Sequence, residues 1–316
     1  MTSSTPAVDA GPATTAPSGA DGLRAAYVRC AAAMALVGAS FTASAALTDY
    51  PLAGGQAVRY AVAALCLLAV MRWRRVAFVL PTPRQAARLA ALAATGLTGF
   101  SAFVVLATRH AEPSLVGAVV GATPVVLAAT QAVRERRLAP RTLAAAVVVT
   151  AGVALVEGLG SADPLGLALA VGALACEAAF SLLAVPLLPA LGALRVSTYA
   201  CVAAVPQLLV LGLLAPGPLL AVPDGTELAA LAYLSVVLTA VAFLLWYSGL
   251  ARVGAARAGL FAGLMPVAAL ATSLALGVEA PTAHGVAGAL VVASGLALGL
   301  SSSRAGRRRG RTRVTA

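Results

Sequence analysis

Long apolar stretches alternate with short polar connections along most of this chain. Ten of the stretches are roughly 18–23 residues long, enough for a helix to cross about 30 Å of hydrocarbon. They lie near residues 26–48, 53–73, 86–108, 114–133, 142–159, 165–187, 194–215, 227–249, 256–277 and 283–301. The pattern therefore predicts an all-α membrane protein with ten transmembrane helices and no inserted soluble domain.

Composition supports this interpretation. Of the 316 residues, 60% are hydrophobic and 10% are charged, which excludes an ordinary soluble globular protein. The net charge of +11 does not indicate nucleic-acid binding, because most of the arginines lie in short connections between apolar stretches. Residues 1–23 are rich in small and polar residues and have no apolar run or basic start, so we expect a disordered tail and no signal peptide.

The arginines predict the orientation of the chain. With both termini in the cytoplasm, 20 of the 22 basic residues lie on the cytoplasmic side, and only Arg59 and Arg109 lie toward the outside. Cytoplasmic loops carry such an excess of basic residues. We therefore expect a multi-pass protein of the plasma membrane. Its basic tail at 303–316 can bind anionic lipid, at about 1 kcal/mol per arginine near the surface.

A duplicated pattern divides the chain into two halves. The segments GAVVGATPVVLAAT and GLFAGLMPVAALAT begin at Gly117 and Gly259, 142 residues apart, and matching apolar blocks follow from Leu143 and Val286. Five spans per half force the second half to enter the membrane with the opposite orientation. The sequence thus predicts two inverted five-helix repeats, at 24–160 and 161–302, an arrangement found in many secondary carriers.

Glycine and proline carry the duplicated pattern. The glycines offer small faces for close approach of helices, and the prolines interrupt the helical hydrogen bonds. Freed carbonyls can line a cavity or form a hinge, although a static packing kink would leave the same pattern. The six residues are Gly117, Gly121, Pro124, Gly259, Gly263 and Pro266. We expect the fourth and ninth spans to pack closely, against each other or against their repeat partners.

Glu177 is the most informative single residue, because it lies near the middle of the sixth span. An ionised carboxylate at this depth costs roughly 2.5–3.5 kcal/mol, so it should face a cavity or be protonated. Proton coupling or binding of a substrate ammonium would use this chemistry. A protonated acid bonded to a nearby carbonyl is the structural alternative.

Other polar and aromatic residues are candidates for a cavity wall. Arg59 is expected to snorkel outward or bond a helix end, with contact to an anionic group of a substrate as the alternative. Trp246 and Tyr247 fit either a gate or an interfacial aromatic belt. The remaining candidates, each of which could instead bond a neighbouring helix, are Ser40, Phe41, Thr42, Thr98, Ser101 and Thr239.

The sequence contains no signature of a metal, nucleotide or cofactor site. The four cysteines are isolated within apolar spans, which favours reduced, packed thiols. His110 and His284 are far apart in expected outer loops, with no ligand spacing. No GxxxxGK followed by Ser or Thr occurs, so ATP is not expected to drive the protein.

The segment Leu238–Pro281 resembles the eighth and ninth helices of the drug/metabolite transporter superfamily, in its ten-helix EamA-type branch. The resemblance rests on these residues: Thr239, Trp246, Tyr247, Arg252, Pro266, Gly277 and Glu279, with Gly288 and Gly295 in the last helix. Arg59 with Tyr60, and the segment from Gly38 to Thr42, resemble the second and first helices of the family. The match departs after Pro124, because Glu135 lies two residues too close to the proline to correspond to Glu279.

This resemblance implies export or uptake of small metabolites, amino acids or drugs without ATP hydrolysis, and we expect export. We expect alternating access around a mainly apolar cavity bounded by the first, third, fourth, sixth, eighth and ninth spans. A membrane-embedded enzyme would need a cluster of catalytic side chains that the sequence lacks. A non-transporting membrane protein is a further alternative, and homodimerisation is left open.

Overall fold

The chain folds as a bundle of helices, described here from a computed structural model for residues 19–47, 49–136, 139–158, 160–277 and 282–311. Within this part of the chain, ten helices are long and apolar enough to cross a membrane. They are Asp21–Ser40, Leu52–Trp73, Pro83–Ala107, Pro113–Glu135, Pro140–Glu157, Pro164–Ala184, Leu188–Leu214, Gly225–Val253, Ala255–Ala275 and Ala283–Ser301. The prediction of an all-α protein with ten spans is confirmed, and we number the spans 1–10 in this order.

Six spans are each one helical element, of which α9 is kinked at Gly192, and four spans are interrupted. The single helices are α1 (Gly19–Ala45), α2 (Leu52–Trp73), α7 (Pro140–Glu157), α8 (Pro164–Ala184), α9 (Leu188–Leu214) and α14 (Ala283–Arg311). The α-helical parts of the interrupted spans are α3 (Pro83–Leu92), α4 (Phe100–Ala107), α5 (Pro113–Val120), α6 (Thr123–Glu135), α10 (Gly225–Tyr233), α11 (Ala242–Val253), α12 (Ala255–Gly259) and α13 (Leu264–Ala275).

The interruptions fall in corresponding spans of the two halves. Spans 3 and 8 each contain a π-helical segment, at Ala93–Gly99 and Leu234–Val241. Span 4 breaks between α5 and α6, and span 9 tightens into a 3₁₀ turn at Leu260–Gly263. The duplicated glycine–proline pattern predicts the second pair of interruptions. No sequence pattern indicated the π-helical pair, because a wider turn leaves the apolar composition unchanged.

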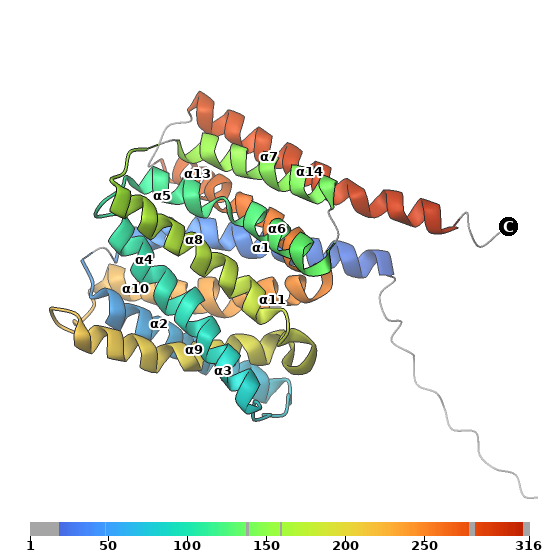
Figure 1. Ribbon diagram of the computed structural model, residues 1–316. Helices are drawn as coiled ribbons and strands as arrows, with labels where there is room; N and C mark the ends of the chain where they lie inside the picture. The colour runs from blue at the N-terminus through green and yellow to red at the C-terminus, as the bar shows by residue number, and fades with distance from the viewer. Residues whose placement is uncertain (1–18, 48, 137–138, 159, 278–281, 312–316) are drawn as a thin grey trace, which may run out of the picture.

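Span 1 is the centre of the bundle. Helix α1 packs against α11 and α13, α2 packs against α9, and α4 packs against α8. Helices α7 and α14 lie together along one side, as Figure 1 shows. Helix α1 begins and α14 ends at the same end of the bundle, which we call the terminal end (Figure 1).

The contact between α7 and α14 is reciprocal. A Cβ added to Gly152 would lie 2.7 Å from the Val292 nitrogen, and one added to Gly295 would lie 2.9 Å from the Val149 nitrogen. Gly152 matches Gly295, and Val149 matches Val292, in the blocks that begin at Leu143 and Val286. The pairing runs antiparallel, as an inverted relation between the two halves requires. The contact therefore supports the prediction of inverted repeats.

A second link joins the halves at the opposite end, between the connections that precede α5 and α8. His110 Nδ1 lies 3.0 Å from Asp163 Oδ2, and the backbone N–H of Asp163 donates to the His110 carbonyl. The Asp163 carboxylate also accepts from the backbone N–H of Gly166. This bond and then His110 hold the pKa of Asp163 below its usual range. His110 is thus bonded to the neighbouring connection.

We predict that Gly152→Leu destabilises the protein, because a larger side chain would separate α7 from α14. Overpacking of this kind costs about 1–3 kcal/mol or more where backbone cannot yield. Thermal unfolding of the purified protein measures the effect. Gly225→Leu is the control, because a Cβ at Gly225 meets nothing within 4 Å. Equal midpoints for the two variants would contradict the proposed role of the contact.

Candidate functional site

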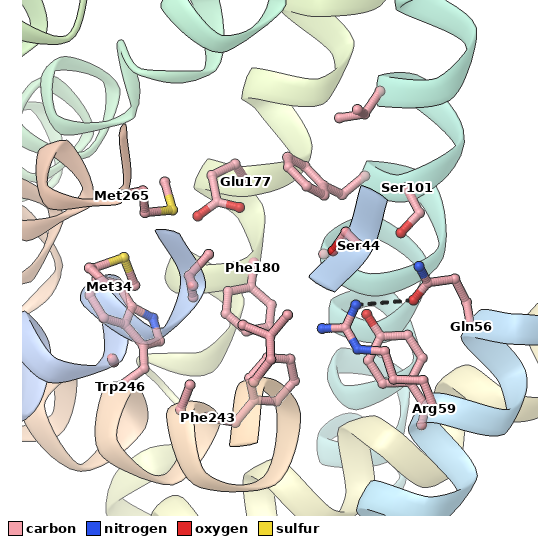
Figure 2. Close-up of a pocket in the computed structure, with 18 of the residues that line it drawn as sticks. Met34, Ser44, Gln56, Arg59, Ser101, Glu177, Phe180, Phe243, Trp246 and Met265 are labelled. Atoms are coloured by element: carbon pink, nitrogen blue, oxygen red, sulfur yellow. Dashed lines mark hydrogen bonds between the residues drawn. The ribbon is translucent and has the colours of Figure 1, made fainter. Parts of the chain in front are cut away.

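A cavity of about 370 Å³ lies inside the bundle, between side chains of spans 1, 2, 3, 6, 8 and 9 (Figure 2). The expected set of spans was partly wrong: span 2 contributes Gln56, Arg59 and Tyr60, and span 4 contributes no lining residue. Span 4 is displaced because α5 packs on α7 and α8, and α6 packs on α7 and α12. The cavity is nevertheless built from both halves of the chain.

The cavity opens away from the terminal end. Ser44 and Leu52, which flank the connection between α1 and α2, belong to its lining and are exposed. At its other end, Tyr60 and Trp246 are buried. Side chains further along toward the terminal end, such as Leu250, are fully packed. The structure thus holds the cavity open on one side and closed on the other.

One wall is apolar and aromatic. Met34 and Met265 lie beside Trp246, and Phe180 and Phe243 continue the surface across the cavity (Figure 2). The Phe180 and Phe243 ring centroids are 5.2 Å apart, and the same distance separates Phe180 from the Tyr247 ring. Tilted rings and flexible thioethers adapt to apolar groups of different shapes.

Arg59 forms the opposite, polar wall. Its Nε donates to Thr239 Oγ1 at 2.7 Å, and one terminal nitrogen donates to Gln56 Oε1 at 3.2 Å. The guanidinium carbon also lies 5.1 Å from the ring centroid of Tyr60. These bonds tie α2 to the π-helical segment of span 8. Arg59 therefore bonds across helices inside the cavity and does not snorkel outward.

Glu177 extends from α8 into the cavity, between Met265 and Phe180 (Figure 2). In the part of the chain that the structure describes, no hydrogen bond or salt bridge joins this carboxylate to another side chain. The acid is half-buried. It is placed to accept a hydrogen bond or a proton from whatever occupies the cavity.

The aromatic-belt interpretation of Trp246 and Tyr247 is wrong. Their exposed fractions are 3% and 0%, whereas residues of a belt lie at the membrane surface. The indole nitrogen of Trp246 and the hydroxyl of Tyr247 are buried without a hydrogen-bond partner among the described residues. Trp246 thus offers the cavity an indole wall with a free N–H nearby.

The remaining polar candidates differ in whether they line the cavity. Ser101 lines the cavity, and its hydroxyl donates to the Leu97 carbonyl. Ser40 does not line it and is buried, with its hydroxyl donating to the Val37 carbonyl within α1. Thr239 is fully buried and reaches the cavity only through Arg59. The side chains of Phe41 and Thr42 lie outside the described residues, as does Glu279.

The glycines of the duplicated pattern mark close helix contacts rather than the cavity wall. A Cβ at Gly117 or Gly121 would meet Glu157 or Val153 of α7, and one at Gly259 would meet Leu127 of α6. A Cβ at Gly263 would meet Val149 and Val292, beside the contact between α7 and α14. Spans 4 and 9 therefore contact each other and span 5.

The two prolines follow the interruptions of their spans. Pro124 lies in the first turn of α6, just after the break at Gly121 and Ala122. Pro266 lies near the start of α13, just after the 3₁₀ turn. Whether these sites move during function stays a prediction.

Sequence reasoning missed several lining residues. They are Met34, Gln56, Phe100, Phe180, Phe243 and Met265. Most are apolar and resemble ordinary lipid-facing or core residues in the sequence. Gln56 carried a usable signal, because an amide is uncommon in a transmembrane helix. Within the described residues, no group of three or more His, Cys, Asp or Glu could hold a metal ion, and all four cysteines are free.

Comparison with known proteins shows similarity to one family of transporters. Residues 164–301 match the model of the EamA-like transporter family. An uncharacterised transporter of Bacillus subtilis, YetK, is 27% identical over 259 residues, which is 78% of each protein. The second half of the chain is therefore similar to EamA-type transporters of the drug/metabolite superfamily.

A solved structure shares the fold of this chain. One crystal structure of a protein superposes on it with a TM-score of 0.77 at 20% identity, covering 87% of this chain and 97% of its own. The matches favour a membrane transporter over a membrane-embedded enzyme. Together with the ten apolar helices they support a multi-pass membrane transporter, whose partners are a small-molecule substrate and the lipid bilayer.

We predict that Thr239→Val destabilises the transporter by roughly 1–3 kcal/mol, because the Arg59 guanidinium loses a buried acceptor. Thermal unfolding of the purified protein measures the change. Thr108→Val is the matched control: Thr108 is exposed, and its hydroxyl bonds only the Val105 carbonyl of its own helix. A shift in Thr239→Val no larger than that of the control would show that the Arg59 bond is dispensable.

Proposed function

We propose that the protein is a secondary carrier that works by alternating access, with residues 24–160 and 161–302 as its two moving repeats. One observation carries the proposal: a cavity lined by both halves is open at one end and closed at the other. Movement of one repeat against the other would exchange the open and closed ends.

The lining indicates the class of solute. A volume of about 370 Å³ lies within the usual range of small-molecule sites, roughly 300–1,000 Å³. The aromatic and methionine wall suits an apolar body. The Glu177 carboxylate suits a protonated amine, and Arg59 adds a positive group on the other side. Amino acids and amine-bearing drugs or metabolites combine these features, and we propose export as the direction.

Energy would come from an ion gradient or from the gradient of the solute itself. The sequence carries no nucleotide-binding loop, and Glu177 is the acid in the described cavity. A proton and a substrate ammonium would compete for this one carboxylate. Such competition couples proton entry to amine exit, because the site cannot hold both at once.

The proposed orientation places the terminal end in the cytoplasm. Arginines near this end include Arg74 and Arg75 after α2 and Arg195 in the first turns of α9. The basic segment at 303–316 would then contact anionic lipid of the inner leaflet. In this orientation the cavity is open to the outside.

We predict that Glu177→Gln abolishes uphill accumulation. Gln keeps the size of the side chain and removes the charge and the exchangeable proton. In proteoliposomes, flux of radiolabelled amines and amino acids driven by a pH gradient should fall at least tenfold. If Glu177 carries only the proton, exchange of substrate without a gradient survives. If it also binds the amine, exchange falls as well.

Glu227→Gln is the control, because Glu227 does not line the cavity and bonds the backbone at the start of α10, and Gln supports the same bonds. It should leave flux unchanged. Near-normal accumulation by Glu177→Gln at every pH tested would remove Glu177 from the mechanism. Absence of flux of any amine or amino acid in the unmodified protein would contradict the carrier proposal for this class of solute.

A further inference from the structure

A second cavity, of about 280 Å³, lies at the terminal end of the bundle. Gln131, Glu135 and Thr142 of spans 4 and 5 line one side, and Val253 and Arg257 of spans 8 and 9 line the other. This cavity also lies between the two halves of the chain. Its polar lining contrasts with the apolar wall of the central cavity.

The two cavities share spans 8 and 9 and are separated by a packed layer. Ala256 lines the second cavity and Met265 lines the central one, about 14 Å apart at the helical rise of 1.5 Å per residue. Between them, Leu260 and Leu250 are fully or almost fully buried. Leu127 of α6 packs into the space left by Gly259 in the same layer.

Gln131 bridges the halves at the edge of this layer. Its Oε1 accepts from the backbone N–H of Ala256 at 3.1 Å, at the start of span 9. Its Nε2 donates to Glu135 Oε1 at 2.7 Å, one turn along α6. The Gln131 amide therefore makes two bonds. Glu135 accepts from its NH₂ group and fixes the orientation of the amide, and the amide oxygen accepts from the backbone of the opposite half.

Several buried polar groups without a partner lie toward the terminal end of the bundle. Five side chains have an inaccessible polar atom without a partner among the described residues: Tyr27, Ser181, Ser197, Trp246 and Tyr247. All five lie in the halves of their spans that are nearer the terminal end. An unpartnered buried hydroxyl is destabilising by about 1–3 kcal/mol, so such groups are rarely retained without use. Water entering from the terminal end would satisfy them.

We propose that Gln131 is the latch of the gate at the terminal end. Its bond to Ala256 holds spans 4 and 9 together while the central cavity is open on the far side. When the bond breaks, the packed layer separates and the second cavity joins the central one. The hydroxyls of Ser181 and Ser197 then face a water-filled path. The proposal rests on the proposed alternating access.

The opposite end of the bundle cannot build the same latch. In the duplicated pattern the position of Gln131 corresponds to Ser273, and that of Ala256 corresponds to Ser114. A serine hydroxyl lies closer to its own backbone than a glutamine carbonyl and cannot span the same gap. The latch is thus specific to the terminal end, which is the closed end in this structure.

The test measures opening directly, without a substrate. Cys30, Cys66, Cys176 and Cys201 are first replaced by Ala, and Ser181→Cys is introduced as a reporter behind the gate. The full chain is placed in lipid nanodiscs, where both faces are accessible, and is treated with a charged maleimide. Ser44→Cys, at the mouth of the central cavity, reports the other end.

We compare Gln131→Met, which keeps the length of the side chain without its acceptor, with the matched control Gln85→Met. Gln85 lies in a local capping box at the start of α3 and does not bridge the halves. Removing one hydrogen bond should raise the labelling rate of the Ser181→Cys reporter roughly two- to tenfold in Gln131→Met. Labelling of the Ser44→Cys reporter should fall, and the control should change neither rate.

Equal labelling of the Ser181→Cys reporter in Gln131→Met and in the parent would overturn the latch, whatever the transport assay gives. A rise at both reporters would also overturn it, because general loosening is not a gate. A monodisperse size-exclusion profile shows that the variant is folded, and Gln131→Ala replaces it if it is not. Opposite changes at the two reporters in a protein without amine flux would support the latch and contradict the proposed substrate class.

Discussion

The close contact of α7 with α14 is the constraint on which the bundle depends. Apolar side chains gain nothing by leaving lipid for another apolar surface, so helices in a membrane associate through close packing. Gly152 and Gly295 allow that packing, each receiving the backbone and side chain of a valine from the other helix. The two glycines are equivalent in the duplicated blocks, so both halves use the same glycine–valine packing. It joins the last span of the first half to the last span of the second.

With that side of the bundle fixed, the other spans are free to enclose a cavity. Span 1 lies at the centre, and spans 2, 3, 6, 8 and 9 complete the wall. The π-helical segments of spans 3 and 8 lie on opposite repeats and both contribute lining residues, Gly96 and Leu238. Wider turns shift the side chains that follow them around the helix axis. The cavity is therefore shaped by departures from regular helix as much as by side-chain choice.

Polar groups inside the bundle divide into two classes. Arg59, Thr239 and Gln56 are bonded to one another and tie the second span to the eighth. Glu177 and the indole nitrogen of Trp246 have no partner in the described residues. Bonded groups stabilise one arrangement of helices, whereas unbonded ones are available to a ligand, a proton or water. The central cavity contains both, which suits a site that must hold its shape and still bind.

The sequence by itself determined the ten spans and their approximate ends, because hydropathy over about 20 residues is a local property. It also determined that Gly117–Thr130 and Gly259–Thr272 interrupt their spans, because proline acts on its own helix. The rotation of each helix about its own axis and the packing of the helices could not be predicted from the sequence. Each residue turns a helix by about 100°, so an error of one position moves a side chain from cavity to core.

Ser40 and Ser44 illustrate what only the tertiary structure decided. Both hydroxyls donate to carbonyls of their own helix, yet Ser40 is buried in the bundle and Ser44 lines the cavity mouth. Glu177 could be identified from the sequence, because a single carboxylate is energetically unfavourable at any position in an apolar span. Gln131 could not, because its role depends on the backbone N–H of Ala256, 125 residues away along the chain. Contacts of this kind arise only when the two halves are packed together, and no local pattern of residues encodes them.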